Sequence, residues 1–160
     1  MGLRVALIRQ SDNLVTQLVD VTPFPTEARF RWEPPPGNYV VLAQQPDGSY
    51  RYVGPGFRYD PANNEFLRPA IEAPLALPVG VQATLTLRWR NENGQPVAYV
   101  HPIHLRITGP EGDTQMHSYD VGPDGGVTVP IVINAPGAYR LEVIEPEMDV
   151  VLDSVVVVVQ

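Results

Sequence analysis

Hydrophobic and polar residues alternate along four segments in the second half of the chain, at residues 83–90, 103–107, 127–133 and 139–143. The side chains of a β-strand point alternately to its two faces, so an alternating segment predicts a strand with one buried face and one face in water. In the first segment the apolar positions are Ala83, Leu85, Leu87 and Trp89. Four such segments close together predict a β-sandwich.

Turn-forming residues divide this half into short strands. Asn93-Gly94 predicts a tight turn, and the sequence GPDGG at 122–126 predicts another. Residues 70–80 contain two prolines and one charge, which predicts either a stiff linker or the first edge strand. With that edge strand included, we expect seven strands, at residues 74–79, 81–91, 98–108, 114–121, 127–133, 138–145 and 150–159.

The first half predicts a small β-meander. Residues 3–9 and 14–21 are apolar strands joined by the turn sequence SDN, which predicts a hairpin. Both strands carry apolar side chains on both faces, so we expect another surface to cover them. Further strands are expected at residues 28–32, 39–43 and 50–53, with a turn at 46–49. We place the boundary between a meander at 1–71 and a sandwich at 72–160.

A run of five valines, residues 155–159, interrupts the alternation in the last strand. Either this strand is buried on both faces inside the fold, or its outer face meets another chain. An exposed edge of this composition would favour aggregation.

The composition narrows the possible functions. The 18 prolines and 13 glycines among 160 residues suit a turn-rich all-β chain, so we expect helix to be nearly absent. Cysteine is absent, which excludes disulfides and thiolate metal sites. We find neither a signal peptide nor a segment of membrane-spanning length, and expect a soluble protein with no membrane partner.

Charge also bears on the choice of partner. The formal net charge is -7, which disfavours nucleic acid as a partner, because a phosphate backbone requires a basic face. Residues 1–79 carry seven Arg against eight Asp and Glu, whereas residues 80–160 carry four against ten. This asymmetry fits a second half that faces solvent and a first half that docks on another molecule. Charge scattered for solubility is the alternative.

We expect no catalytic, cofactor or metal site. His101 and His104 are three residues apart, so in a strand they point to opposite faces and do not share an ion. The acidic turns show no spacing of calcium ligands; their residues are Glu111, Asp113, Asp120 and Asp124. No serine stands in a GxSxG motif, and no glycine-rich loop precedes a helix.

The first 70 residues resemble a short module found at the start of tailed-phage virion proteins. That module has the order "YALI, polar turn, VVxNVIV", then "PPxGY", then "GxGWxYDGxxFxPP". Here VALIR, SDN, LVTQLVDV, PPPGNYVVL and VGPGFRYDPANNEFLRP follow in the same order. Phe57 stands where the module has Trp, and PANN replaces a tighter Gly turn. On physical grounds, Phe57, Tyr59 and Phe66 are expected to form an aromatic clasp over the meander.

Residues 80–160 resemble the immunoglobulin-like modules of the invasin type. NGQPV, YDVGPDGGVTV and APGAYRLEV stand where those families have "DxNGxPV", "TDxxGxaxv" and "xxPGxYxLtV". The resemblance implies an immunoglobulin-like β-sandwich, which is a fold shared by spacers, adhesins and decoration modules.

Together the two resemblances imply a non-catalytic phage virion structural protein on the capsid surface, made in the host cytoplasm. They favour a capsid decoration protein that binds the major capsid protein or another virion protein as a homotrimer. A tail accessory or tail-tip protein and a surface-adhesion module are the alternatives, and a thermophilic source suits the proline-rich loops. The expected contact residues are Leu3, Val5 and Leu7, by strand addition, and Phe57, Tyr59 and Phe66, as anchors. The alternative is that all six fill the small N-terminal core.

Overall fold

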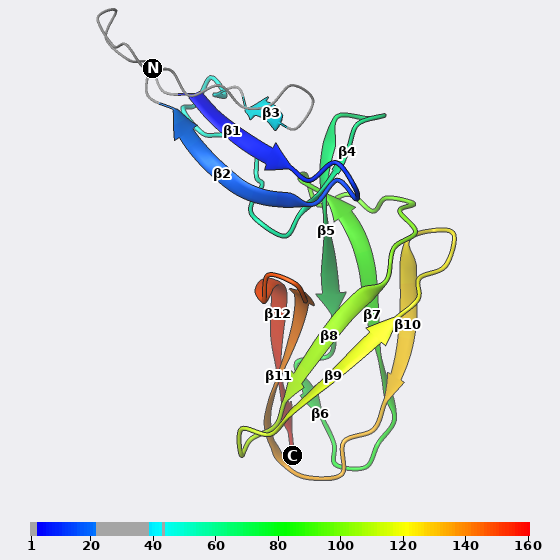
Figure 1. Ribbon diagram of the computed structural model, residues 1–160. Helices are drawn as coiled ribbons and strands as arrows, with labels where there is room; N and C mark the ends of the chain where they lie inside the picture. Colours follow the sequence, from blue (N-terminus) through cyan, green and yellow to red (C-terminus); the bar gives the residue numbers. More distant parts are fainter. Residues whose placement is uncertain (1–2, 22–38, 43) are drawn as a thin grey trace, which may run out of the picture. The chain divides into compact units, whose positions relative to one another are not determined.

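The computed structural model describes residues 3–21, 39–42 and 44–160, and these residues form strands and turns with no helix (Figure 1). Within these ranges the chain has no helix with the length and hydrophobicity needed to cross a membrane. The chain divides into two compact units, Met1–Leu67 and Arg68–Gln160. This division falls inside one strand, whereas the sequence placed the boundary at 71/72.

The first unit contains a three-stranded antiparallel sheet with the order β2-β1-β3. Its strands are β1 (Leu3–Ile8), β2 (Val15–Val21) and β3 (Tyr39–Leu42). Asn13 adopts a left-handed conformation, with φ of 60°, in the turn between β1 and β2, and a bulge follows Leu7. The predicted hairpin and the predicted strand at 39–43 are therefore confirmed, and the strand expected at 28–32 lies outside the described residues.

A second hairpin completes the first unit. Its strands are β4 (Arg58–Asp60) and β5 (Glu65–Glu72), and the turn between them contains Asn64 with φ of 51°. The strand expected at 50–53 is not formed. The rings of this segment pack instead: Tyr50 lies under the Arg4 guanidinium at 4.6 Å, and Tyr52 meets the Phe57 ring edge-on at 5.5 Å. The aromatic residues of this segment therefore make ring contacts instead of pairing as part of a strand.

The core of the first unit lies under the face of β1 that carries Ala6 and Ile8. The loop before β4 joins it through backbone hydrogen bonds: Val15 N donates to Phe57 O, and Gly56 N donates to Val15 O, both at 2.8 Å. The buried apolar residues of the unit are Val5, Ala6, Ile8, Leu14, Val15, Leu42, Phe57, Phe66 and Leu67.

The second unit is a sandwich of two sheets, whose strands pair antiparallel except where β6 meets β12. One sheet has the order β10-β7-β5-β4, in which β5 contains the boundary between the units, and the other has the order β6-β12-β11-β8-β9. The remaining strands are β6 (Ala76–Leu77), β7 (Ala83–Asn91), β8 (Ile103–Thr108), β9 (Thr114–Tyr119), β10 (Gly126–Ile131), β11 (Gly137–Glu145) and β12 (Val150–Val159). Each of the seven predicted segments overlaps one of them, and β10 and β11 begin one residue before the predicted bounds.

The strand order is that of an immunoglobulin-like sandwich. β5, β7 and β10 correspond to strands A, B and E, whereas β8, β11 and β12 correspond to C, F and G. The first strand changes sheets, because β5 lies beside β7 and β6 pairs in parallel with β12. At the start of β11, the Tyr139 hydroxyl donates to Ala135 O at 2.9 Å, which is the tyrosine corner of this fold. The all-β class and the immunoglobulin-like sandwich are confirmed. The first unit is not a meander, because β3 pairs with β1 rather than with β2.

The valine run corrects one expectation. Along β12 the burial alternates: Val157 and Val159 are 0 % and 1 % exposed, whereas Val156 and Val158 are 48 % and 38 % exposed. Burial on both faces inside the fold is therefore wrong, because only one sheet face meets the core. The inward valines pack in the sandwich with the other buried residues Leu85, Leu87, Trp89, Ile103, Leu105, Leu141 and Val143.

Candidate functional site

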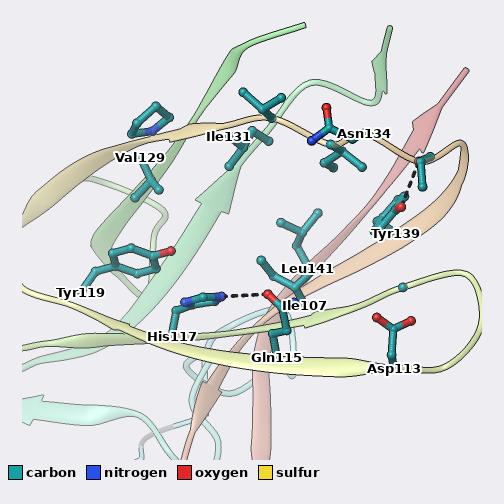
Figure 2. Close-up of a pocket in the computed structure, with 15 residues that line it drawn as sticks. Ile107, Asp113, Gln115, His117, Tyr119, Val129, Ile131, Asn134, Tyr139 and Leu141 are labelled. Carbon is teal, nitrogen blue, oxygen red and sulfur yellow. Dashed lines mark hydrogen bonds between the residues drawn. The ribbon is translucent and has the colours of Figure 1, made fainter. Parts of the chain in front are cut away.

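The second unit has a groove of about 490 Å³ between β9, at the edge of one sheet, and β10, at the edge of the other (Figure 2). Apolar side chains from both sheets line one part of it, and polar side chains of β9 and the neighbouring turns line the other. The lining includes Ile107, Val129, Ile131, Ile133, Leu141, Tyr139, Asp113, Gln115, His117, Tyr119 and Asn134.

The groove exists because β9 is polar on the face where a sandwich strand is normally apolar. Gln115, His117 and Tyr119 are two residues apart, so they share the inner face of β9 and point toward the groove. Gln115 and His117 are exposed, and they leave the apolar residue Ile107 only half-buried on this side, whereas Leu141 beside it is 1 % exposed. The two sheets are therefore open toward solvent between β9 and β10.

Hydrogen bonding and ring packing hold these side chains. His117 Nε2 lies 3.4 Å from Gln115 Oε1, and the His117 and Tyr119 rings are stacked with centroids 6.1 Å apart. Burial raises the pKa of the Tyr119 hydroxyl, which stays neutral and able to donate at physiological pH. Tyr139 contributes only its ring, because its hydroxyl is bonded to Ala135 O.

These groups do not form a catalytic set of a familiar kind. Ser118 follows His117 in β9, so its hydroxyl lies on the opposite face of the strand. Among the residues that the structure describes, no group of three or more His, Cys, Asp or Glu side chains is placed to hold a metal ion. The groove can offer apolar packing, ring faces, amide and hydroxyl groups, and the Asp113 carboxylate.

The remaining histidines serve local packing. The His101 ring is stacked on Tyr99, with centroids 5.9 Å apart, and meets Trp89 edge-on at 5.8 Å. The indole Nε1 of Trp89 donates to His101 O at 2.9 Å. His104 lies in β8 opposite Ser118 of β9, away from this aromatic cluster.

Asp124 lies in one of the acidic turns, and hydrogen bonds from neighbouring residues fix its carboxylate. Its carboxylate accepts from Gly126 N at 3.2 Å and from Arg88 Nη2 at 3.1 Å. These two bonds, the first being the larger influence, hold the pKa of Asp124 below its usual range.

The structure places the predicted contact residues of β1 in the middle of a sheet. Val5 pairs with Val19 of β2 on one side and with Val41 of β3 on the other. Strand addition at β1 is therefore wrong, because both edges of the strand are already hydrogen bonded. Val5 is buried and Leu7 is half-buried. Leu3 pairs with Val21, and its side chain lies outside the described set.

The predicted aromatic anchors lie within the first unit. Phe57 and Phe66 are 5 % and 0 % exposed, so these two fill the core as the alternative proposed. Tyr59 is half-buried, with its ring centroid 5.1 Å from that of Phe66. Its hydroxyl donates to Asn64 Oδ1 at 3.0 Å. Tyr59 and Phe66 therefore pack together, whereas the Phe57 ring meets Tyr52, and the two phenylalanines have little surface left for a partner.

An apolar surface that we did not predict from the sequence lies on the sheet formed by β2, β1 and β3. Tyr39 and Val41 of β3 are 36 % and 48 % exposed, and their cross-strand partners are Leu7 and Val5. Opposed residues share a sheet face, so these four side chains lie together. We call the exposed pair, with the half-buried Leu7, the β3 strip. The signal was hidden because Tyr39, Val40, Val41 and Leu42 are all apolar, so no alternation marks the outer face.

Comparison with known proteins gives little further information. No protein-family model and no curated protein matches the chain. One similar solved structure is the CARDB domain of the PF1109 protein from Pyrococcus furiosus, in complex with di-metal ions. Its sequence is 20% identical to this one, and the alignment covers 60% of this chain and 89% of that chain, with a TM-score of 0.38. This likeness is too distant to carry an argument about function.

Proposed function

We propose that the chain is a non-catalytic structural protein of a tailed-phage virion, and specifically a capsid decoration protein. Its partner is the major capsid protein or another virion protein. The proposal is supported by the resemblance of the first 70 residues to phage virion modules and by the β3 strip in that same unit. The strip is the observation that carries the docking function.

The β3 strip has the chemistry of a protein-docking surface. Tyrosine is enriched among the few residues that contribute most of the binding energy at the centre of an interface, and neighbouring side chains there exclude water. Residues in either role must be exposed before binding. Tyr39 and Val41 meet this condition, whereas Val5, Phe57 and Phe66 do not. Docking by the sheet face replaces the strand addition expected from the sequence.

A surface of this size would act through repetition. Each Å² of apolar surface buried on docking contributes about 25 cal/mol, so a modest footprint gives a weak bond. A decoration protein that bridges neighbouring shell subunits repeats this bond over the whole capsid and opposes separation of the subunits. The homotrimer belongs to the same proposal and rests on the resemblance alone.

The absence of enzymatic activity is part of the proposal. The groove of the second unit presents His117 without a nucleophile on the same strand face, and its other polar groups are neutral amides, a tyrosine and Asp113. This arrangement supports recognition rather than bond cleavage.

The proposal is tested by mixing the full chain with purified expanded heads and with purified tails, and measuring co-sedimentation. We expect saturable binding to heads, and we expect the Val41→Asp substitution to weaken it at least tenfold by placing a charge in the apolar contact. Val100→Asp is the matched control, because Val100 is 67 % exposed in the second unit.

Three results would contradict the proposal. Absence of saturable binding to heads rejects decoration, and binding to tails alone makes the chain a tail component. Equal loss in Val41→Asp and Val100→Asp removes the β3 strip from the docking surface. Deletion of residues 1–10 is a poor test, because β1 is the central strand of its sheet and the unit would unfold.

A further inference from the structure

Three edges of the second unit differ in how well they are protected against pairing with another strand. In β10 the edge is blocked by Pro130, which has no N–H. Trp89 N donates to Gly125 O, and hydrogen-bonded pairs alternate along an antiparallel ladder, so the nitrogen of Pro130 faces away from β7. Proline in this position is a common device against strand addition.

The edge of β12 is covered in a different way. Val158 N donates to Leu75 O and Gln160 N donates to Leu77 O, which ties the end of β12 to the β6 segment. Further along, Ser154 N donates to the Asp153 carboxylate at 3.0 Å. The N–H groups of Ser154, Val158 and Gln160 on this edge are thus occupied by the chain itself.

β9 has no comparable protection. It ends its sheet among the strands that the structure describes, and residues 114–118 are all exposed. Gly109 N donates to Asp113 O at the closing turn, so the alternation directs the backbone groups of Thr114, Met116 and Ser118 away from β8. The strand contains no Pro, Lys, Arg, Asp or Glu, although the chain carries a net charge of -7.

We propose that β9 pairs with β9 of a second copy of this chain, antiparallel, around a twofold axis at Met116. A twofold axis perpendicular to the sheet makes the inner face of one copy continuous with the inner face of the other. Residues that oppose each other across the axis must therefore point to the same face, which means that they are an even number of positions apart in β9. Centring on Met116 opposes Thr114 with Ser118, and each of the three outward-directed residues then lies in a hydrogen-bonded pair.

The side chains of β9 are complementary to themselves in this register. Thr114 faces Ser118 of the partner copy, which is a favourable hydroxyl pair, and the two Met116 side chains meet on the outer face. On the inner face Gln115 opposes His117 of the partner copy. The same two groups lie 3.4 Å apart within one copy, so donor and acceptor are already suitably matched. No like charges are opposed anywhere along the strand.

Pairing of this kind also accounts for the groove. A strand added beside β9 extends its sheet on the side where β10 leaves the sandwich open. The inner-face side chains of the added strand then face Val129 and Ile131 of β10. Each copy covers the apolar groove of the other, so neither sandwich keeps it exposed to water.

The test is sedimentation velocity of the full chain over a range of concentrations. We expect the unmodified chain to show a concentration-dependent dimer, and Met116→Lys to sediment as a monomer where the unmodified chain is dimeric. The substitution places two like charges at the twofold axis, and Met116 is 52 % exposed, so the fold tolerates it. Val156→Lys is the matched control, with a 48 % exposed valine on the outer face of the same sheet, and it should remain a dimer.

An equimolar mixture of Met116→Lys and Met116→Glu adds a second measurement. The opposite charges meet at the axis, so the mixture is expected to recover the dimer that each variant alone loses. A monomer at every concentration overturns the proposal, as does a dimer that Val156→Lys abolishes and Met116→Lys does not. Failure of the mixture to recover the dimer overturns the register. A trimer that persists in Met116→Lys overturns β9 pairing, while supporting the oligomer expected of a decoration protein.

Discussion

At the scale of single residues, Gly125 has the strictest requirement in the second unit. Its φ is +81°, and an added Cβ would overlap the carbonyl oxygen of Val97 and lie 2.9 Å from Tyr99 N. Both obstacles are backbone atoms, so no side chain can move aside. The close approach places the strand end beside the segment that carries Tyr99 and His101.

We expect Gly125→Ala to lower the free energy of unfolding by more than about 2 kcal/mol, because left-handed strain adds to backbone overlap. Gly94→Ala is the control: its φ is +79°, and nothing lies within 4 Å of an added Cβ, so only strain of about 1 kcal/mol applies. Urea unfolding followed by circular dichroism measures both. Equal losses in the two variants would show that the overlap is relieved.

Asp12 holds the turn between β1 and β2 to the first residue of β4. Its carboxylate accepts from Arg9 Nη2 at 2.5 Å and from Arg58 Nη1 at 3.0 Å, and the Arg58 side chain is buried. The hydrogen bond from Arg9 is the main cause that holds the pKa of Asp12 far below its usual range. Burial acts in the opposite direction and is the smaller influence.

The lowered pKa predicts an acid-sensitive first unit. The folded state binds the Asp12 proton less readily than the unfolded state, so this stability is present above about pH 4 and is lost as pH falls toward the folded pKa. Asp12→Asn should lower the free energy of unfolding by about 1–3 kcal/mol at pH 7 and flatten its decline below pH 4. Asp20→Asn is the control, because Asp20 is 71% exposed in its pair with Arg4. An unchanged acid profile in Asp12→Asn would contradict the assignment.

At the scale of elements, alternation in the sequence was enough to find most strands of the sandwich. Residues 83–91 and 103–106 alternate between buried and less buried positions as predicted, whereas Ile107 is only half-buried. The alternation gave no correct prediction of burial where apolar residues are continuous. The run at 155–159 carries no pattern, yet its burial alternates because one sheet face is in water.

The strand β5 was also missed. Residues 70–80 were predicted to form a stiff linker or a first edge strand, and no strand was predicted at residues 65–69. In the structure Ala70 and Ile71 are buried, and Ile71 N donates to the Asp153 carboxylate at 2.9 Å. A contact made 82 residues away cannot be inferred from local pattern.

Candidate sites were harder to predict than strands, because sites depend on which strands are neighbours. The apolar composition of β1 was read correctly, but its central position between β2 and β3 was not visible in the sequence. The groove was missed altogether: its lining comes from β8, β9, β10 and β11 and the turns between them. Gln115, His117 and Tyr119 were the available signal, as polar and aromatic residues at alternate positions of one strand.

At the scale of the whole molecule, the chain is built from two units with separate cores. Phe66 and Leu14 are fully buried in the first unit, and Leu87, Leu105 and Val143 are fully buried in the second. Each unit therefore removes its own apolar surface from water. The division of charge follows the same line, since most of the excess acid lies in the second unit.

We expect a fragment of residues 68–160 to fold alone, because it keeps β6 to β12 whole and most of β5, and these strands carry the core of the sandwich. It should show a β-type circular dichroism spectrum and a single cooperative transition in urea. A fragment without a cooperative transition would mean that the first unit supplies stability that its separate core does not suggest.

Trp89 gives the second unit an intrinsic optical reporter. Its indole is 3 % exposed, bonded to His101 O and packed against Tyr99, so it should emit at the short wavelengths typical of an indole shielded from water. Trp32 is the other tryptophan of the chain, and replacing it with Phe would leave a single emitter. A red shift of its fluorescence would then register opening of the sandwich without any attached dye.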